Sequence, residues 1–289
     1  MNTIILTVTH KNFDDSLLPD GYKVIRVGKN QKMLDSQNQE FSDAHGEDNI
    51  ASENPWYCEL TAQYWAWKNL PQADILGLVH YRRYFMDYQK TATCFRDDIL
   101  SKKTIEKILN SGKYDIIVPI LSSKLKNSSI MYKDRPLEAQ DKHWQIIYNI
   151  IKEFYPEYTT AFEKVIYGKK QLWYNMFIAN REVFCAYSDW LFGILKHYDN
   201  YIENTLHEER IPRVDGFLAE LLPLVWIKAN IPSEKIKHYD IKNTEDNNLA
   251  YDHSIKSLFR KIVYCNPILL TTFKKLQMEF RIFLNFYTK

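Results

Sequence analysis

The sequence lacks the signals of several large protein classes. It has only four cysteines, which lie far apart and form no CxxC pair: Cys58, Cys94, Cys185 and Cys265. We therefore expect free thiols in a reducing compartment and no zinc site. No apolar run approaches the roughly 20 residues that a membrane-spanning helix needs. The first residues show no basic segment followed by a long apolar run, so we expect no signal peptide and a cytoplasmic location.

Common catalytic motifs are missing as well. The chain contains no GxGxxG, no GxxxxGK[ST] and no GxSxG, which removes the main support for a dehydrogenase, a P-loop kinase or a serine hydrolase. It also contains no short Asp-x-Asp. The adjacent pairs Asp14-Asp15 and Asp97-Asp98 would point to opposite faces of a strand. Asp43 and His45 form a closely spaced pair in the polar stretch 30–50, so a metal site there is a minor alternative.

The composition indicates a folded domain rather than a low-complexity chain. Of 289 residues, 45% are hydrophobic and 15% aromatic, with only eight glycines and ten prolines. A net charge of +2 makes a general nucleic-acid binder unexpected. The charge is uneven, however, because residues 254–289 hold seven Lys or Arg and one acid. This basic, aromatic segment predicts a helix on an anionic membrane surface or, equally, a core-packing helix pair with a solvated basic face.

The hydrophobic periodicity predicts an α/β protein. We expect buried strands at 3–9, 22–27, 75–79, 114–119 and 172–178, and helices at 54–69, 99–109, 139–154, 183–198 and 217–227. Strand, strand, helix, strand in the first 80 residues is typical of this class. The polar stretches 30–50 and 121–136 read as long loops, the second a candidate lid. We expect one α/β domain with a mostly parallel sheet at 1–235 and a helical extension at 236–289.

The strongest candidate site follows the predicted strand at 75–79. It places His80, Arg82 and Arg83 among aromatic residues. Ligands bind at the carboxyl ends of strands in α/β folds, and the arginine fork donates two parallel hydrogen bonds to a phosphate. Cations that are packed together repel one another unless an anion joins them. The cluster therefore predicts a diphosphate site, and the alternative is a basic strand end that pairs with surface acids.

Two polar pairs are further candidates for nucleotide contacts. His10 and Lys11 follow the first predicted strand, where a nucleotide often lies. An ordinary solvated turn is as good an interpretation. Asp48 and Asn49 precede the first predicted helix and have the groups to bind a base or a ribose. Capping and turn formation explain these two residues equally well.

Three polar residues in apolar surroundings are candidates for catalysis or for ligand binding. Glu220 lies in the apolar stretch 216–226, where a carboxylate needs a partner, and perturbed carboxylates often act as general bases. A buried salt bridge to Arg213 is the alternative. Asp215 is the second candidate base. Asn175, inside a predicted apolar strand, holds either a ligand hydroxyl or the backbone of a loop.

Five blocks resemble one bacterial protein family, domain of unknown function 4422 (DUF4422), whose members act in capsule and exopolysaccharide biosynthesis. The resemblance runs from about residue 3 to about residue 230, and its specific part is the helix block together with the HYRR block. The blocks are Gly46–Ile50, Asn54–Asn69, Gly77–Phe85, Tyr174–Ile178 and Arg213–Glu220.

The resemblance implies a glycosyltransferase with a GT-A-like nucleotide-sugar fold, associated with transfer of galactose or galactofuranose. Most GT-A enzymes have a metal-binding Asp-x-Asp where this chain has His80, Arg82 and Arg83. We therefore expect these fixed cations to replace the metal ion and no cofactor to be needed; the alternative is Mg²⁺ or Mn²⁺ held elsewhere. The family pattern has an aromatic or apolar residue at Asp215, which leaves Glu220 as the better base.

The resulting hypothesis is an inverting hexosyltransferase that uses a UDP-sugar donor and a lipid-linked saccharide acceptor at the inner face of the membrane. Its expected catalytic residues are Glu220, Arg82 and Arg83. Its expected substrate-binding residues are His10, Lys11, Asp48, Asn49, Lys68, His80, Arg82, Arg83, Asn175, Arg213 and Asp215. Two other classes remain open, a non-catalytic module that binds a nucleotide or polysaccharide, and a sugar phosphotransferase.

Overall fold

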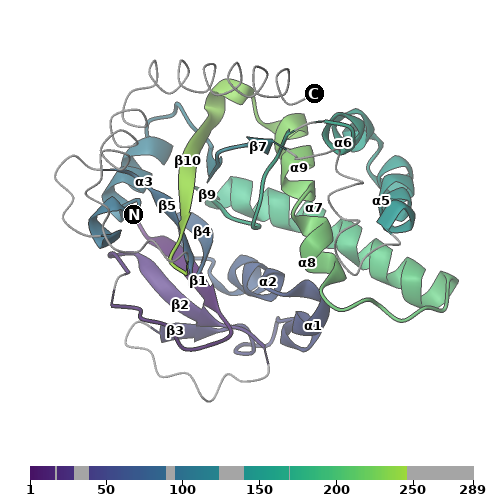
Figure 1. Ribbon diagram of the computed structural model, residues 1–289, viewed down its shortest axis with the longest axis horizontal. Helices are drawn as coiled ribbons and strands as arrows, with labels where there is room; N and C mark the ends of the chain where they lie inside the picture. The colour runs from purple at the N-terminus through teal and green to yellow at the C-terminus, as the bar shows by residue number, and fades with distance from the viewer. Residues whose placement is uncertain (17, 29–38, 89–94, 124–139, 169, 246–289) are drawn as a thin grey trace, which may run out of the picture.

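The computed structural model describes residues 1–16, 18–28, 39–88, 95–123, 140–168 and 170–245 (Figure 1). Its strands are β1 (Thr3–Thr9), β2 (Tyr22–Arg26), β3 (Gln39–Ser42), β4 (Ile75–His80), β5 (Arg83–Met86), β6 (Ile116–Pro119), β7 (Ser122–Ser123), β8 (Lys170–Gln171), β9 (Phe177–Asn180) and β10 (Ile236–Asn243). Its α-helices are α1 (Asn54–Tyr57), α2 (Leu60–Asn69), α3 (Lys102–Leu109), α5 (Gln140–Phe154), α6 (Thr159–Ile166), α7 (Arg181–Asn200), α8 (Val214–Ala219) and α9 (Leu222–Asn230).

The α/β class is confirmed, but the sheet is mixed rather than mostly parallel. Eight strands pair in the order β3-β2-β1-β4-β5-β10-β6-β9, and β4 also pairs with β9. The strands β3, β2, β1 and β4 run parallel to one another. β5 and β9 run antiparallel to their neighbours. The antiparallel half arises because β4 turns back directly into β5 and because β9 enters the sheet in the opposite direction.

The strand β1 is the centre of the parallel half. All seven of its residues are buried, and all seven are β-branched or leucine, a composition that suits a strand covered on both faces. Its register aligns Val8 with His80 of β4 and Thr9 with Arg26 of β2. The carboxyl ends of these three strands therefore meet at one edge of the sheet.

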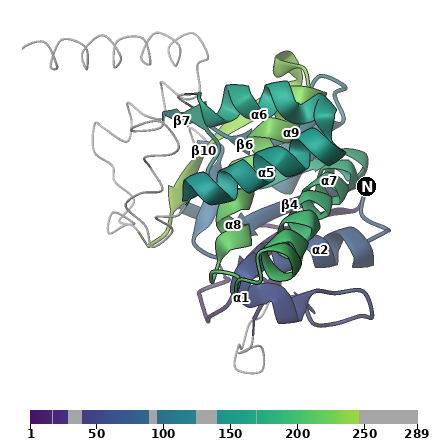
Figure 2. The same ribbon diagram turned by 90° about the vertical axis from the view of Figure 1, so that its right-hand side faces the viewer.

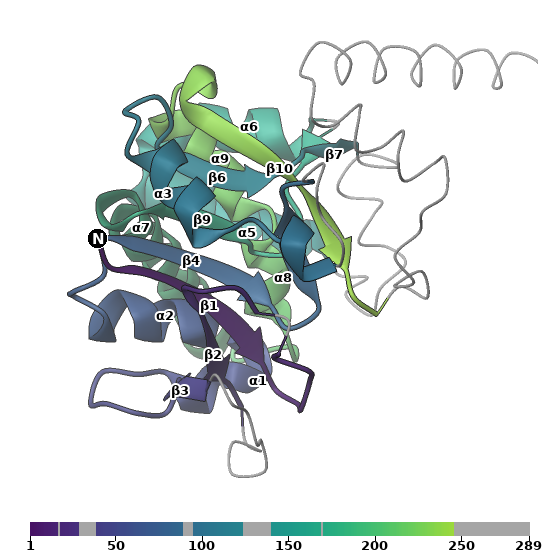
Figure 3. The same ribbon diagram turned by 90° about the vertical axis from the view of Figure 1, so that its left-hand side faces the viewer.

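The two faces of the sheet are covered unequally. Side chains such as Leu6 and Leu78 face a large core that includes α2, α5, α6, α7 and α9 (Figure 2). Side chains such as Ile5 and Val79 face a smaller core closed by α3 (Figure 3). Neighbouring residues of a strand point to opposite faces, so both layers follow from the alternation. No helix in the described ranges is long and apolar enough to cross a membrane.

Three predicted elements are interrupted or shortened in the structure. The helix expected at 54–69 is interrupted at Cys58, whose φ of 52° ends α1 before α2 begins. The strand expected at 172–178 starts only at Phe177, because Tyr174 and Asn175 have φ of 79° and 48°. The helix expected at 217–227 divides into α8 and α9. Backbone conformations of this kind depend on tertiary contacts, which hydrophobic periodicity does not register.

Other predicted boundaries also change. The strand β3 lies within the stretch expected to be irregular and pairs with β2. The predicted domain boundary at 235 falls just before β10, which pairs with β5 and β6 inside the sheet. The rest of the predicted C-terminal extension, 246–289, lies outside the described residues, and so does 124–136 of the predicted lid.

Gly77 in the middle of β4 makes room for two neighbours. The registered partners Ile5 and Ile178 fill the space where a side chain would stand, and a Cβ at Gly77 would come within 2.7 Å of Ile178 Cγ1. We expect Gly77→Ala to lower the free energy of unfolding by about 1–3 kcal/mol because both isoleucines are fully buried. Urea unfolding measures this. Lys103→Ala, on the exposed side of α3, is the control and should change stability by less than about 0.5 kcal/mol. Equal effects of the two substitutions would contradict the packing argument.

Candidate functional site

The site lies where β1 and β4 end side by side (Figure 3). His80 is the last residue of β4 and pairs with Arg83, the first residue of β5. Tyr81 and Arg82 therefore form the two-residue turn of a hairpin at this edge. The chain after β1 brings His10 and Lys11 to the same place, and the His10 and Tyr81 rings meet edge to face at 5.7 Å. The predicted HYRR cluster and the predicted His10-Lys11 pair are thus one site.

A carboxylate from the end of β10 bridges two of these cations. Glu245 accepts from Lys11 Nζ at 2.9 Å and from Arg82 Nη1 at 2.5 Å. Tyr81 OH also donates to Glu245 at 3.3 Å, and the Lys11 ammonium lies 4.9 Å from the centre of the Tyr81 ring. These hydrogen bonds, first from Arg82 and then from Lys11, lower the pKa of Glu245 to about 2. The cations at this edge already hold an anionic oxygen pair.

Arg213 completes one side of the cluster. Its left-handed backbone, with φ of 67°, starts α8, and its amide donates to Pro55 O at 2.9 Å. Its exposed guanidinium packs over the Phe217 ring, and its charge opposes the rise that burial causes in the pKa of the Cys58 thiol. The charge of Arg213 also helps to lower the pKa of His10. The break between α1 and α2 therefore faces the end of β1.

His80 lies on the inner side of the cluster. Its Nε2 is 2.7 Å from Tyr174 O and 3.9 Å from Glu59 Oε1. A carbonyl oxygen only accepts, so Nε2 carries a proton. The Arg83 guanidinium stacks over the Tyr174 ring at 4.3 Å. The turn before β9 thus holds both an imidazole and a guanidinium.

The amide of Asn175 joins three elements. Its Nδ2 donates to Glu59 Oε1 at 2.9 Å and to Gly216 O at 3.0 Å. The residue is 4% exposed. The sequence left two roles open for Asn175, binding a ligand hydroxyl or binding a loop backbone. In the structure its side chain hydrogen-bonds the backbone of α8 and, in addition, the Glu59 carboxylate. It does so from a left-handed turn and not from a strand, which corrects the predicted context.

The charges of the site do not balance. Burial first, and then the neighbouring cations, lower the pKa of His10. Burial lowers the pKa of His80, against the pull of Glu59. Both imidazoles are therefore neutral near pH 7. Glu245 pairs with Lys11 and Arg82, whereas in the described residues Arg83 and Arg213 form no ion pair with a carboxylate, so two positive charges are left unmatched. The site is suited to a dianion.

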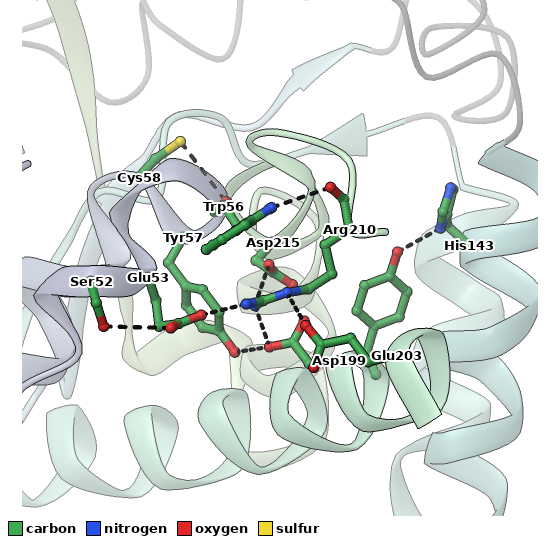
Figure 4. Close-up of polar contacts among 11 residues, drawn as sticks. Ser52, Glu53, Trp56, Tyr57, Cys58, His143, Asp199, Glu203, Arg210 and Asp215 are labelled. Atoms are coloured by element: carbon green, nitrogen blue, oxygen red, sulfur yellow. Dashed lines mark hydrogen bonds and ion pairs between the residues drawn. The ribbon is translucent and has the colours of Figure 1, made fainter. Parts of the chain in front are cut away.

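A second polar cluster lies behind Cys58 and fixes the loop before α8 (Figure 4). Arg210, 8% exposed, pairs with Glu53 at 2.5 Å, Glu203 at 2.8 Å and Asp199 at 3.0 Å, and its Nη1 is 3.9 Å from Asp215. Its guanidinium also stacks over Trp56, whose indole donates to Arg210 O. One cation faces four carboxyl groups here.

Burial raises the pKa of the two inner carboxyl groups of this cluster, Asp199 and Asp215. Asp215 is fully buried, and burial followed by the Asp199 charge raises its pKa well above the usual range. Burial also raises the pKa of Asp199, although Tyr57 OH and Arg210 donate to it. Asp215 thus lies inside a sealed cluster, away from the open strand ends where a base would meet an acceptor.

Three predicted binding residues lie at the other end of α2. Asp48 accepts from Tyr64 OH and, through its carbonyl, from Asn69, and Asn49 hydrogen-bonds Gly46 and Ala51. These are the turn and capping roles that the sequence left open. Lys68 stacks over Trp67 at 3.5 Å. Because α2 is about 15 Å long, these contacts place all three residues far from Glu59 and the cations.

The remaining candidates are placed as follows. Glu220 is half-buried at the end of α8, two turns or roughly 10 Å beyond Arg213 along the helix. Its role as a base stays a prediction. Asp43 is buried and accepts from Thr61, while His45 is exposed. In the described part of the chain, no three His, Cys, Asp or Glu side chains are grouped as metal ligands.

Sequence reasoning missed two residues of the site, Glu59 and Glu245. Glu59 follows the break at Cys58, and neither Cys nor Glu signals an interruption in a helix-forming stretch. Glu245 lies in a polar run after β10 and meets Lys11 across 234 residues. No local signal exists for a contact of that range.

The buried proton of Asp215 predicts a specific pH dependence. The unfolded chain releases this proton above about pH 4, whereas the folded chain keeps it up to the raised pKa, so stability falls with rising pH over that interval. Relative to Asp215→Asn, the wild type should lose up to about 1.4 kcal/mol per pH unit there. Urea unfolding from pH 5 to pH 8 measures the difference. The exposed Asp189→Asn should run parallel to wild type; if Asp215→Asn also does, the proton is not held.

Among the solved structures that resemble this chain, that of WbbM is similar enough to support an argument. The structure of the bifunctional glycosyltransferase WbbM without ligand is similar with a TM-score of 0.69 and 28% identity, over 85% of this chain and 46% of that one. This chain thus spans less than half of WbbM. The mannosyltransferase Ktr4p from S. cerevisiae (TM-score 0.33, 12% identity, 76% and 65% covered) and a 4-diphosphocytidyl-2C-methyl-D-erythritol synthase from Anaerococcus prevotii DSM 20548 (0.28, 11%, 90% and 97%) are too distant to support an argument.

Comparison of the sequence with protein families finds a match, whereas comparison with curated proteins finds none. No curated protein matches the chain. The family described as Domain of unknown function (DUF4422) matches residues 4–231. These residues include β1, β4, the HYRR turn, Asn175 and Arg213, and they span most of the chain, so the protein belongs to the DUF4422 family.

Proposed function

We propose that this protein is a glycosyltransferase that binds the diphosphate of a UDP-sugar at the ends of β1 and β4. One observation supports this most strongly. Arg83 and Arg213, which form no ion pair with a carboxylate in the described residues, lie with Lys11 and Arg82 at the carboxyl edge of the parallel half of the sheet, in a chain that resembles a glycosyltransferase over 85% of its length. The GT-A-like arrangement implied by the sequence belongs to this proposal.

Arg82 and Lys11 are the natural ligands of the diphosphate. They already hold the two oxygens of Glu245, which a phosphate pair can replace with more charge and the same hydrogen-bond geometry. Arg83, stacked on Tyr174, adds a third cation nearby. When the sugar leaves, negative charge grows on UDP, and fixed cations stabilise that charge without having to reorganise.

These side chains do not suit a divalent ion at the same position. Mg²⁺ and Mn²⁺ prefer oxygen ligands, whereas this strand end presents guanidinium, ammonium and imidazole groups. Fixed cations then do the work that a metal ion does at an Asp-x-Asp. Neutral His10 lies where it can hydrogen-bond the nucleotide.

The sugar and acceptor follow from the family resemblance. We propose a galactose or galactofuranose donor and a lipid-linked saccharide acceptor of a capsular or exopolysaccharide, with inversion at the anomeric carbon. The basic residues 254–289 would then lie on the anionic inner face of the membrane.

The direct experiment is calorimetry with UDP and a panel of UDP-sugars, followed by assay of UDP release with and without saccharide acceptors. Release of UMP would indicate a sugar phosphotransferase, and binding without any turnover would indicate a binding module.

Substitutions at Arg82 and Glu245 should act in opposite directions. Arg82→Ala removes charged hydrogen bonds to the diphosphate and should weaken UDP binding about tenfold to a hundredfold. Glu245→Gln removes the competing carboxylate and should tighten UDP binding. Calorimetry measures both, with Lys103→Ala on α3 as a control that leaves affinity unchanged. Unchanged affinity in Arg82→Ala would show that the diphosphate binds elsewhere.

Chelation tests the replacement of a metal ion. Transfer should continue at its full rate after treatment with EDTA, because the cations that neutralise the leaving UDP are side chains. The measurement is UDP release before and after EDTA, with later addition of Mn²⁺ or Mg²⁺. Loss of activity that either ion restores would contradict the proposal.

A further inference from the structure

Glu59 is the carboxylate of the site whose position is most tightly constrained. It directly precedes α2, after the left-handed break at Cys58. Its side chain is 17% exposed, its Oε1 accepts from Asn175 at 2.9 Å, and the same oxygen lies 3.9 Å from His80 Nε2. Both neighbours stand at the strand-end site.

One turn of the chain positions both Glu59 and His80. The backbone carbonyl of Tyr174 accepts a hydrogen bond from His80 Nε2. The side-chain amide of the next residue, Asn175, donates hydrogen bonds to Glu59 and to Gly216 O. Tyr174 and Asn175 both have left-handed backbones, which cost non-glycine residues of the order of 1 kcal/mol each. Strain of this kind persists where surrounding contacts require it, and here it sets the carboxylate relative to the imidazole.

Glu59 differs from Glu245 in its partners. Glu245 is held by a lysine and an arginine, whereas Glu59 has no ion pair with a lysine or arginine anywhere in the described ranges. Its neighbours are an amide and a neutral imidazole, and within those ranges its Oε2 receives no hydrogen bond. A carboxylate that is held through one oxygen and has the other available is arranged to accept a proton.

We propose that Glu59 is the general base that removes the proton from the acceptor hydroxyl; this rests on the function proposed above. The hydroxyl proton moves to Glu59 as the acceptor oxygen bonds to the anomeric carbon, opposite the diphosphate. The bond from that carbon to the diphosphate oxygen breaks, and its electron pair leaves with UDP toward Arg82 and Lys11. Asn175 is a positioning residue that orients Glu59. The alternative base, Glu220, lies roughly 10 Å beyond Arg213 along α8.

The test separates proton transfer from donor binding. Glu59→Gln keeps the shape and can still meet the Asn175 amide, but it does not accept the proton, so kcat for transfer should fall about a hundredfold to ten-thousandfold. The Kd for UDP and the KM for the donor should stay within about twofold of wild type. Glu153→Gln, the same substitution on the exposed side of α5, should leave all values unchanged.

Two further variants keep the result decisive if Glu59→Gln folds poorly. Glu59→Asp keeps the charge but shortens the reach, so kcat should fall while donor affinity holds. Asn175→Ala should lower kcat with an unchanged donor KM. We also expect kcat of the wild type to fall on the acid side, as the base becomes protonated, and this fall should be absent from the residual activity of Glu59→Gln.

The outcomes distinguish the two proposals. Transfer at near the wild-type rate by Glu59→Gln, or loss of transfer in Glu220→Gln alone, overturns the role of Glu59 while leaving the donor site intact. A wild-type protein that binds UDP-sugars but never transfers, or binds none, overturns the proposed function itself.

Discussion

The alignment of β1 with β4 brings several positive charges together at the carboxyl edge of the sheet, and the surrounding structure has to accommodate their repulsion. Val8 pairs with His80, so the chain beyond β1 and the turn beyond β4 must share one small region, and both carry cations. Such a region is stable only with counter-charges and aromatic faces around it. Glu245 supplies a counter-charge from β10, and the rings of Tyr81 and Tyr174 support the cations. What remains is an excess of positive charge that a dianionic ligand would satisfy.

Backbone strain is concentrated around the same edge. Of the five non-glycine residues with positive φ in the described part of the chain, four lie at the site: Cys58, Tyr174, Asn175 and Arg213. The neighbouring Arg210 cluster ties α1, α7 and the start of α8 together, so these conformations are held from outside the site. Rigid elements carry the strain, and the side chains of the site gain fixed positions from it.

Fixed cations and a bound metal ion solve the same problem in different ways. At the proposed donor site, a metal ion would gather oxygen ligands and arrive with the nucleotide, whereas Arg82 and Lys11 are present in advance and need a counter-charge when no nucleotide is bound. Glu245 performs that neutralisation through contacts across the whole chain. The carboxylate of Glu59, with an amide and an imidazole for neighbours, is left for a different task from the carboxylate of Glu245.

Local signals in the sequence were enough for β1, β4 and α7, because a buried strand or an amphipathic helix records its surroundings in its own residues. They also placed His80, Arg82 and Arg83 together at a strand end, since a cluster of cations is itself a local pattern; the role of these residues in binding stays a prediction. Only the tertiary structure decided the antiparallel half of the sheet and the break at Cys58. It also decided that Asp48 and Lys68 lie at the end of α2 that is far from the cations. It alone brought Glu59 to Asn175 and Glu245 to Lys11, across 116 and 234 residues, because such pairs exist only when distant strands align.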